Sequence, residues 1–212
     1  MSEQPIRSQI YVVVEAGPAA ADRLAAALGA GDVASVLIRP GNGAVLDAGA
    51  AQPLVALAQG KGVAALIEND AGLARALRAD GVHLLPSADI AERLEAARSL
   101  LGGRAIVGAD PGRSRHDAMT LAELGADYMA FSSDGEGGAG ARDELCAWWA
   151  EIFEIPCVAI DVADAEAAVA LQRARCEFVG VSLPAGEPAD AARARVADLA
   201  RALAEDHAGA PA

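Results

Sequence analysis

Lysine is almost absent from this chain of 212 residues, in which Lys61 is the one lysine among seventeen cationic side chains. Any mechanism that needs a lysine therefore has a single candidate. Aromatic residues make up only 3% although 53% of residues are hydrophobic, so we expect a large aliphatic core. No signal peptide opens the chain, and no apolar run approaches the roughly 18 residues that cross a bilayer. We therefore expect a cytoplasmic protein without a membrane partner.

Cysteine is also scarce, and its spacing is not that of a metal site. Cys146, Cys157 and Cys176 are odd in number and far apart in the chain, so we expect small buried side chains in a reducing compartment rather than disulfides. Basic charge is low as well, because the net charge is −13 and no basic stretch offsets it. Such a surface repels polyanions, which excludes nucleic acid and favours a small-molecule ligand.

The stretch from Lys61 to Ser87 indicates the fold. It holds two short apolar runs, separated by a polar turn and one short helical segment, and such a strand–crossover–strand unit is typical of a parallel sheet. The same alternation recurs along the chain and predicts a single α/β domain, a (β/α)8 TIM barrel over residues 10–203. The ends, 1–9 and 204–212, are predicted to be flexible. A Rossmann domain is not favoured, since the loop after the first strand lacks G-x-G-x-x-G.

The expected elements follow from the apolar runs and the turn residues between them. A glycine-rich loop, 135–140, precedes the sixth helix and is either a lid or an ordinary surface loop. The turn that ends the second strand is expected at 40–43. We predict strands at 11–15, 33–39, 63–67, 81–84, 105–108, 128–131, 157–160 and 178–182, and helices at 19–28, 48–59, 72–78, 89–101, 115–124, 142–153, 164–173 and 190–203.

Three stretches carry a family resemblance. AALIENDAGLARALRADGVHLLPS at 64–87, GADYMAF at 125–131 and PCVAI at 156–160 resemble the thiamine-phosphate synthases. That family joins an aminopyrimidine pyrophosphate to a thiazole phosphate and releases pyrophosphate with magnesium. The resemblance implies a catalytic Arg39 and Asn69, a Mg²⁺ ion on Asp70, and a phosphate contact at Ser182.

The chain departs from the family pattern at several positions. Leu37 and Gly41 stand where the family has glutamine and lysine, and the loop after the sixth strand lacks the expected threonine and lysine. Asp161 and Val162 replace the Gly-Gly pair whose bare amides approach a phosphate, and Asp89 is the only candidate for the second metal carboxylate. These departures favour a diverged or repurposed member.

Carboxylates end every second predicted strand. Glu15, Asp70, Asp110 and Asp161 follow the first, third, fifth and seventh strands, and alternate strands contribute to one layer of a barrel. We therefore expect a ring of carboxylates at the mouth that binds a divalent cation or a cationic ligand. The alternative interpretation is that Asp110 and Asp161 cap turns while the other two are solvated.

Three functions remain open from the sequence. They are a diverged member that binds or regulates, an active synthase with a rearranged site, and a tautomerase-like or otherwise repurposed enzyme. His83 is expected to be buried with a backbone partner, and His116 is a candidate for proton transfer. Trp148 and Trp149 are adjacent on a predicted helix, so they cannot both face the same side. Either one of them is exposed for a homodimer contact, or both pack within the chain.

Overall fold

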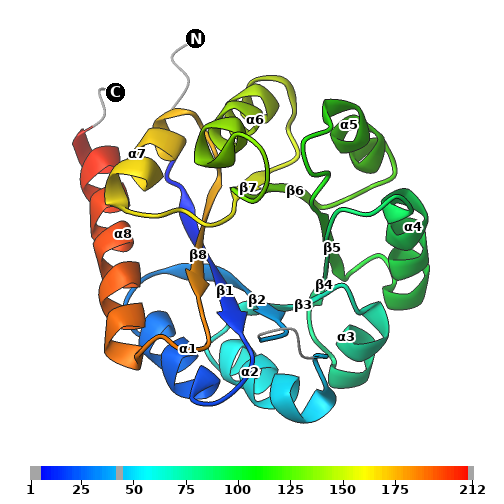
Figure 1. Ribbon diagram of the computed structural model, residues 1–212, viewed down its shortest axis with the longest axis horizontal. Coiled ribbons are helices and arrows are strands. Elements are labelled where there is room, and N and C mark those ends of the chain that lie inside the picture. Colours follow the sequence, from blue (N-terminus) through cyan, green and yellow to red (C-terminus); the bar gives the residue numbers. More distant parts are fainter. Residues whose placement is uncertain (1–5, 42–44, 210–212) are drawn as a thin grey trace.

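The computed structural model describes residues 6–41 and 45–209, which form a closed barrel of eight parallel strands inside a ring of eight helices (Figure 1). Each strand pairs with its neighbours in chain order, and the first closes on the last. The predicted (β/α)8 barrel is confirmed. The strands are β1 (Gln9–Glu15), β2 (Val33–Arg39), β3 (Ala64–Glu68), β4 (Gly81–Leu84), β5 (Ile106–Ala109), β6 (Tyr128–Phe131), β7 (Cys157–Ala159) and β8 (Phe178–Leu183). The helices are α1 (Ala20–Leu28), α2 (Ala48–Gly60), α3 (Ala71–Leu77), α4 (Ile90–Leu101), α5 (Arg115–Glu123), α6 (Gly138–Ile152), α7 (Ala165–Arg173) and α8 (Ala189–Gly209).

Two apolar layers hold the barrel together. Side chains on one face of each strand fill the interior, and those on the other face pack against the helices, because successive residues of a strand point to opposite faces. On β1, Tyr11 and Val13 belong to the inner layer, while Val12 and Val14 belong to the outer one. Both layers are mostly aliphatic, as the composition predicts.

Two tyrosines, Tyr11 on β1 and Tyr128 on β6, interrupt this aliphatic pattern in the barrel interior. Tyr128 on β6 reaches across the interior, and Gly108 on β5 makes room for it. A Cβ atom at position 108 would lie 2.0 Å from the tyrosine ring. Glycine at 108 is therefore required by the close approach of an aromatic side chain.

Both chain ends are more ordered than predicted within the described range. Helix α8 continues to Gly209, so the expected flexible tail at 204–212 is wrong for residues 204–209. Asp206 accepts hydrogen bonds from Gln172 and Arg173, and this pairing holds the last turns against α7. Ser8 is buried and bonds to Gln172 and Cys176, which fixes the chain just before β1. Residues 1–5 and 210–212 lie outside the described residues, as does part of the turn predicted at 40–43.

The glycine-rich segment is shorter than predicted because α6 begins at Gly138 rather than near Arg142. The amide of Ala141 donates to the carbonyl of Gly137, which starts the helical hydrogen bonding inside the predicted loop. Gly137 has a φ of 82°, a conformation that glycine adopts readily. The helix start at Asp164 agrees with its prediction as an N-cap, since its carboxylate accepts from the amide of Ala167.

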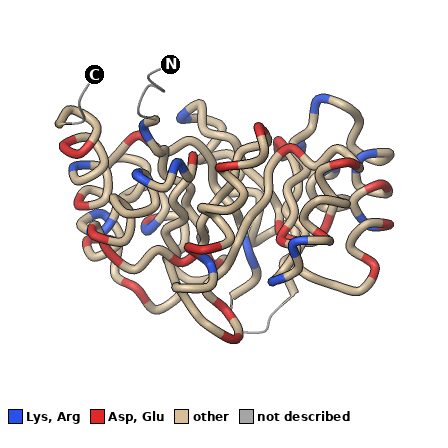
Figure 2. The backbone as a smooth tube through the Cα atoms, turned by 90° about the horizontal axis from the view of Figure 1, so that it is seen from above, with Lys and Arg blue, Asp and Glu red and all other residues tan. Residues whose placement is uncertain are grey.

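Figure 2 marks the charged positions along the backbone of the barrel. Lys and Arg positions are interspersed with Asp and Glu positions on both sides of the molecule in this view. No helix of the described residues is long and apolar enough to cross a membrane.

Candidate functional site

A cavity of about 310 Å³ lies at the carboxyl ends of the strands. In a (β/α)8 barrel this end carries the functional residues, because the loops after the strands converge there. Two arginines and four carboxylic acids take part in its wall, which leaves an excess of acidic groups. The lining residues are Val13, Leu37, Arg39, Glu68, His83, Leu85, Pro86, Asp110, Gly112, Arg113, Ser132, Asp134, Gly135, Ile160 and Asp161.

Arg39 and Glu68 form an ion pair in this wall. Nε of Arg39 lies 3.5 Å from the carboxylate of Glu68, which is 7% exposed in its side chain. Burial raises the pKa of Glu68, and the neighbouring Arg39 lowers it. The predicted site arginine therefore reaches the cavity, but part of its charge is already balanced by a carboxylate.

Asp110 is buried beside the same cavity. Its carboxylate accepts from the amide of Gly112 at 2.7 Å and is only 2% exposed. Burial raises its pKa from 3.8 to about 6, against the lowering effects of Gly112, Ser132 and Arg113. A carboxyl group that titrates near neutral pH can both accept and donate a proton, which is typical of a functional carboxylate.

A chain of buried polar side chains leads from the cavity into the barrel. Nδ1 of His83 lies 2.9 Å from the hydroxyl of Tyr128, which lies 2.9 Å from the hydroxyl of Tyr11. The prediction that a buried His83 bonds to the backbone is therefore wrong in its partner, because Nδ1 of His83 bonds to the hydroxyl of Tyr128 instead. Burial, followed by the charge of Arg39, lowers the pKa of His83 from 6.5 to about 4. The imidazole at the cavity floor is therefore neutral at pH 7.

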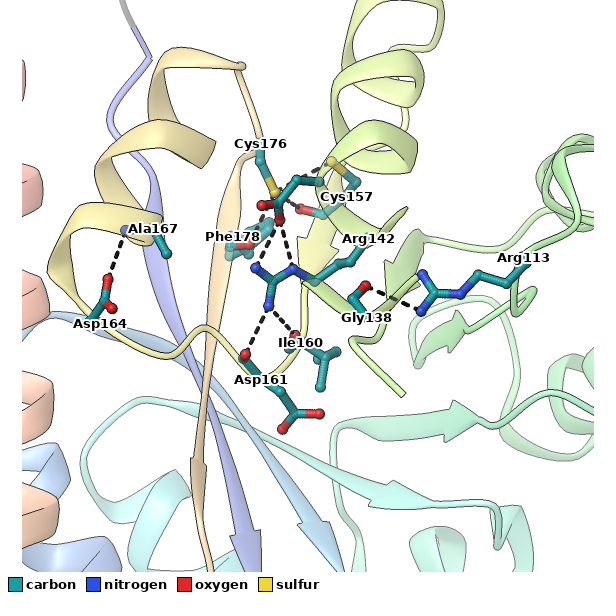
Figure 3. A network of polar contacts seen from close by, with 11 residues as sticks. Arg113, Gly138, Arg142, Cys157, Ile160, Asp161, Asp164, Ala167, Cys176 and Phe178 are labelled. Atoms are coloured by element: carbon teal, nitrogen blue, oxygen red, sulfur yellow. Dashed lines mark hydrogen bonds and ion pairs between the residues drawn. The ribbon is translucent and has the colours of Figure 1, made fainter. Parts of the chain in front are cut away.

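The ends of β7 and β8 are joined by side chains rather than left open. Ser182 donates from its hydroxyl to the carboxylate of Asp161, and Asp161 has a φ of 59°. Beneath this pair the buried guanidinium of Arg142 donates to the carbonyls of Ile160 and Asp161, at 3.0 and 2.8 Å (Figure 3). Both predicted residues, Asp161 and Ser182, are thus brought together, with their polar atoms directed at one another.

Asn69 and Asp70 lie at the end of β3 outside the cavity lining. The side-chain oxygen of Asn69 accepts from the amide of Leu85 and from Arg93. One carboxylate oxygen of Asp70 accepts from the amide of Leu73 and caps α3. Both side chains are exposed, but each already has a structural partner.

The four predicted carboxylates do not form one metal-binding cluster among the described residues. Glu15 accepts from the amide of Ala185, and Asp70 caps a helix, so only Asp110 and Asp161 line the cavity. Within the described part of the chain, the one group of three possible ligands whose atoms lie within 4.8 Å of one another consists of cysteines. The predicted single-ion ring is therefore wrong in its geometry, because two of its members bond to neighbouring backbone instead.

Two residues in and next to the cavity wall, Glu68 and Tyr128, were not predicted from the sequence. Glu68 directly follows the apolar run that was predicted as a strand at 63–67, and the structure extends that strand by one residue to include it. Arg113 lies in a turn and donates to the carbonyl of Asp134 in the next loop. Tyr128 does not line the cavity, but its hydroxyl contacts His83, which does. The sequence gave no sign of this contact, because the rest of β6 is apolar. His116, by contrast, is exposed on α5 and does not line the cavity.

The perturbed pKa values of His83 and Asp110 predict opposite pH effects on stability. His83 has a folded pKa of about 4, below its usual 6.5, so its contribution is lost as the pH falls from 6.5 to 4. Asp110 has a folded pKa of about 6, above its usual 3.8, so its contribution is lost as the pH rises from 3.8 to 6. Between pH 4 and 6 these two contributions largely cancel.

Replacing Asp110 by asparagine removes the contribution of Asp110 to the pH dependence of stability and leaves that of His83. We expect the variant to gain stability over the wild type as the pH rises from 4 to 6, by up to about 3 kcal/mol for a shift of this size. Urea unfolding of both proteins at half-unit pH intervals measures the difference. A difference that stays flat across this range would contradict a raised pKa at Asp110.

The comparisons with known proteins agree with one another. A family model described as thiamine monophosphate synthase matches residues 10–185. A thiamine-phosphate synthase of Hyphomonas neptunium is 38% identical over 194 residues, covering 83% of this chain and 85% of that protein. One of Rhodospirillum centenum is 39% identical over 197 residues, covering 86% of this chain and 90% of that protein. The solved thiamine phosphate pyrophosphorylase of Pyrococcus furiosus superposes with a TM-score of 0.76 at 20% identity, over 96% of this chain and 99% of that one, which supports the fold.

Proposed function

The chain belongs to the thiamine monophosphate synthase family, and we propose that it is a diverged member whose barrel mouth binds a small nitrogen heterocycle without a phosphate group. Such a ligand is chemically one half of the family's substrates, with the anionic part removed. The cavity of about 310 Å³ is large enough for one such ring and its substituents.

The observation that carries this proposal is the Asp161–Ser182 pair. A carboxylate stands at the end of β7, and its partner is the hydroxyl that would otherwise be free to donate to a phosphate. Two like unit charges about 4 Å apart repel by about 4 kcal/mol at an effective dielectric constant near 20. Pro184 then follows β8 and offers no amide, so this corner of the cavity is unfavourable for an anion.

The remaining cavity groups suit an amino-substituted heterocycle. Glu68 and Asp110 are buried acceptors for ring amino groups. The ion pair with Arg39 holds the carboxylate of Glu68 in place. His83 is a neutral imidazole at the cavity floor that supplies a further hydrogen-bonding atom. Asp110 also serves as an acid or base near neutral pH, so the site supports proton transfer on the ring as well as simple binding.

An active synthase with a rearranged site is the second candidate. Its support is the 38% identity to a thiamine-phosphate synthase over 83% of the chain, together with Arg39 in the cavity wall. Magnesium would then be held by Asp70 and by Asp89 in the loop before α4. One carboxylate oxygen of Asp70 caps α3, and the other would bind the ion. The ion would supply charge neutralisation of a pyrophosphate leaving group, while Arg39 would orient it.

Titration calorimetry with matched ligands distinguishes these candidates. We expect the aminopyrimidine alcohol to bind, and its pyrophosphate ester with Mg²⁺ to bind at least tenfold more weakly, because the ester brings negative charge to an acidic mouth. Asp110→Asn should weaken binding of the alcohol, whereas Asp198→Asn on the far surface should not change it. Tighter binding of the ester than of the alcohol would sink the proposal and favour the synthase.

A further inference from the structure

Three cysteines meet in the layer between the sheet and the helices. Cys146 lies on α6, Cys157 is the first residue of β7, and Cys176 lies two residues before β8. All three side chains are 0% exposed, and their sulfur atoms lie within 4.8 Å of one another. Their spacing in the sequence gave no sign of this cluster, because the fold alone brings them together.

The sulfur separations fit ligands of one metal ion. Metal–thiolate bonds are about 2.3 Å long, so three sulfurs around one ion lie roughly 3.8–4.0 Å apart. The sulfurs of Cys157 and Cys176 are 3.5 Å apart, and all three sulfurs lie within 4.8 Å of one another, so small shifts bring them to these separations. Figure 3 labels Cys157 and Cys176. A disulfide would need a sulfur–sulfur distance of about 2.05 Å. The two sulfurs would have to move farther to form it than to bind one ion together.

The ligand set decides which ion would bind. Within the described residues, no histidine, aspartate or glutamate joins the three sulfurs as a fourth ligand. Structural zinc sites almost always have four ligands, whereas thiolates alone select soft ions such as Cu(I), for which three sulfurs are a complete set. Arg142 lies four residues before Cys146 on the same face of α6 and is 1% exposed, so it supplies a nearby positive charge.

We propose that Cys146, Cys157 and Cys176 form a trithiolate site for a soft monovalent metal ion of the Cu(I) class. Binding replaces the three thiol protons by one monovalent ion, so three protons are released to solvent and no electron is transferred. The three thiolates and the ion then carry a net charge of −2, which the nearby guanidinium of Arg142 offsets in part. The site lies between β7 and the helices that cover it, and none of its three cysteines lines the ligand cavity. Metal binding there is therefore independent of ligand binding in the cavity. Packing on all sides excludes water from the ion.

The test uses the reduced, metal-free chain and Cu(I) supplied from a coloured chelator. We expect transfer of one ion per chain, an ultraviolet thiolate-to-copper charge-transfer band, and a higher melting temperature. Each of the single variants Cys146→Ser, Cys157→Ser and Cys176→Ser should bind Cu(I) at least about a hundredfold more weakly, because only two of the three thiolate ligands remain. Circular dichroism identifies any variant that does not fold, and the alanine variant then replaces it.

A second measurement on the wild type does not depend on variants. X-ray absorption at the copper edge should show three sulfur neighbours and no nitrogen or oxygen neighbours. To remove any barrier to entry, the chain is also refolded from denaturant in the presence of Cu(I). No transfer after refolding, an absorption spectrum with nitrogen or oxygen ligands, or loss of two hydrogens to a Cys157–Cys176 disulfide in place of uptake would each overturn the proposal.

Discussion

Replacing Asp161 by glycine is expected to raise the affinity of the barrel mouth for inorganic pyrophosphate by about tenfold to a thousandfold. The substitution removes one negative charge from the end of β7, where repulsion of an anion about 4 Å away amounts to about 4 kcal/mol before screening by salt. It also frees the hydroxyl of Ser182, which now donates to that carboxylate. The backbone tolerates the change, since a φ of 59° at this position suits glycine.

Asp161→Asn is the matched control, because asparagine keeps the shape and tolerates the same backbone conformation. If charge excludes the anion, both variants should bind pyrophosphate more tightly than the wild type in titration calorimetry. Raising the salt concentration should narrow the gap between variants and wild type. Equal affinities in all three proteins at low salt would show that Asp161 does not exclude a phosphate.

Loss of Arg142 is expected to destabilise the barrel by about 3–5 kcal/mol. The guanidinium is 1% exposed and donates to two backbone carbonyls at the end of β7, and it forms an ion pair with Asp143. Replacing it by alanine leaves the carbonyls of Ile160 and Asp161 buried without this donor and opens a cavity. Urea unfolding of Arg142→Ala measures the loss, and ligand binding at the cavity should fall with it.

Arg201→Ala provides a comparison within the same residue type. Arg201 is exposed on α8 and pairs with Asp198 and Glu205 at the surface, where ion pairs contribute little. Its replacement should leave the unfolding midpoint unchanged. If Arg142→Ala unfolded at the same urea concentration as Arg201→Ala and the wild type, the buried guanidinium would not support the end of β7.

The barrel could be predicted from the sequence because each strand and helix has a local signal. Short apolar runs between turn residues located all eight strands to within about two residues, and β2, β4 and β6 agree at both ends. The ends of the chain were harder. Asp206 pairs with Arg173 and Gln172 on α7, and a contact between residues so far apart in sequence leaves no periodic pattern in the tail.

The site was predicted only in part, because its chemistry depends on contacts across the barrel. Arg39, Asp110 and Asp161 reach the cavity as their places after strands predicted. Asn69 does not line it, since its side chain bonds to neighbouring loops. The hydrogen bond between Nδ1 of His83 and the hydroxyl of Tyr128 joins β4 to β6, and the rest of each strand is apolar, so no sequence pattern revealed it.

The most direct test of the proposed divergence is an assay of pyrophosphate release. The purified chain is given aminopyrimidine pyrophosphate, thiazole phosphate and Mg²⁺ at high protein concentration, beside the Hyphomonas neptunium synthase as a positive control. We predict no release above background from the folded protein. Turnover that is abolished by Asp70→Ala would contradict the account and show that this acidic mouth still carries out the transfer.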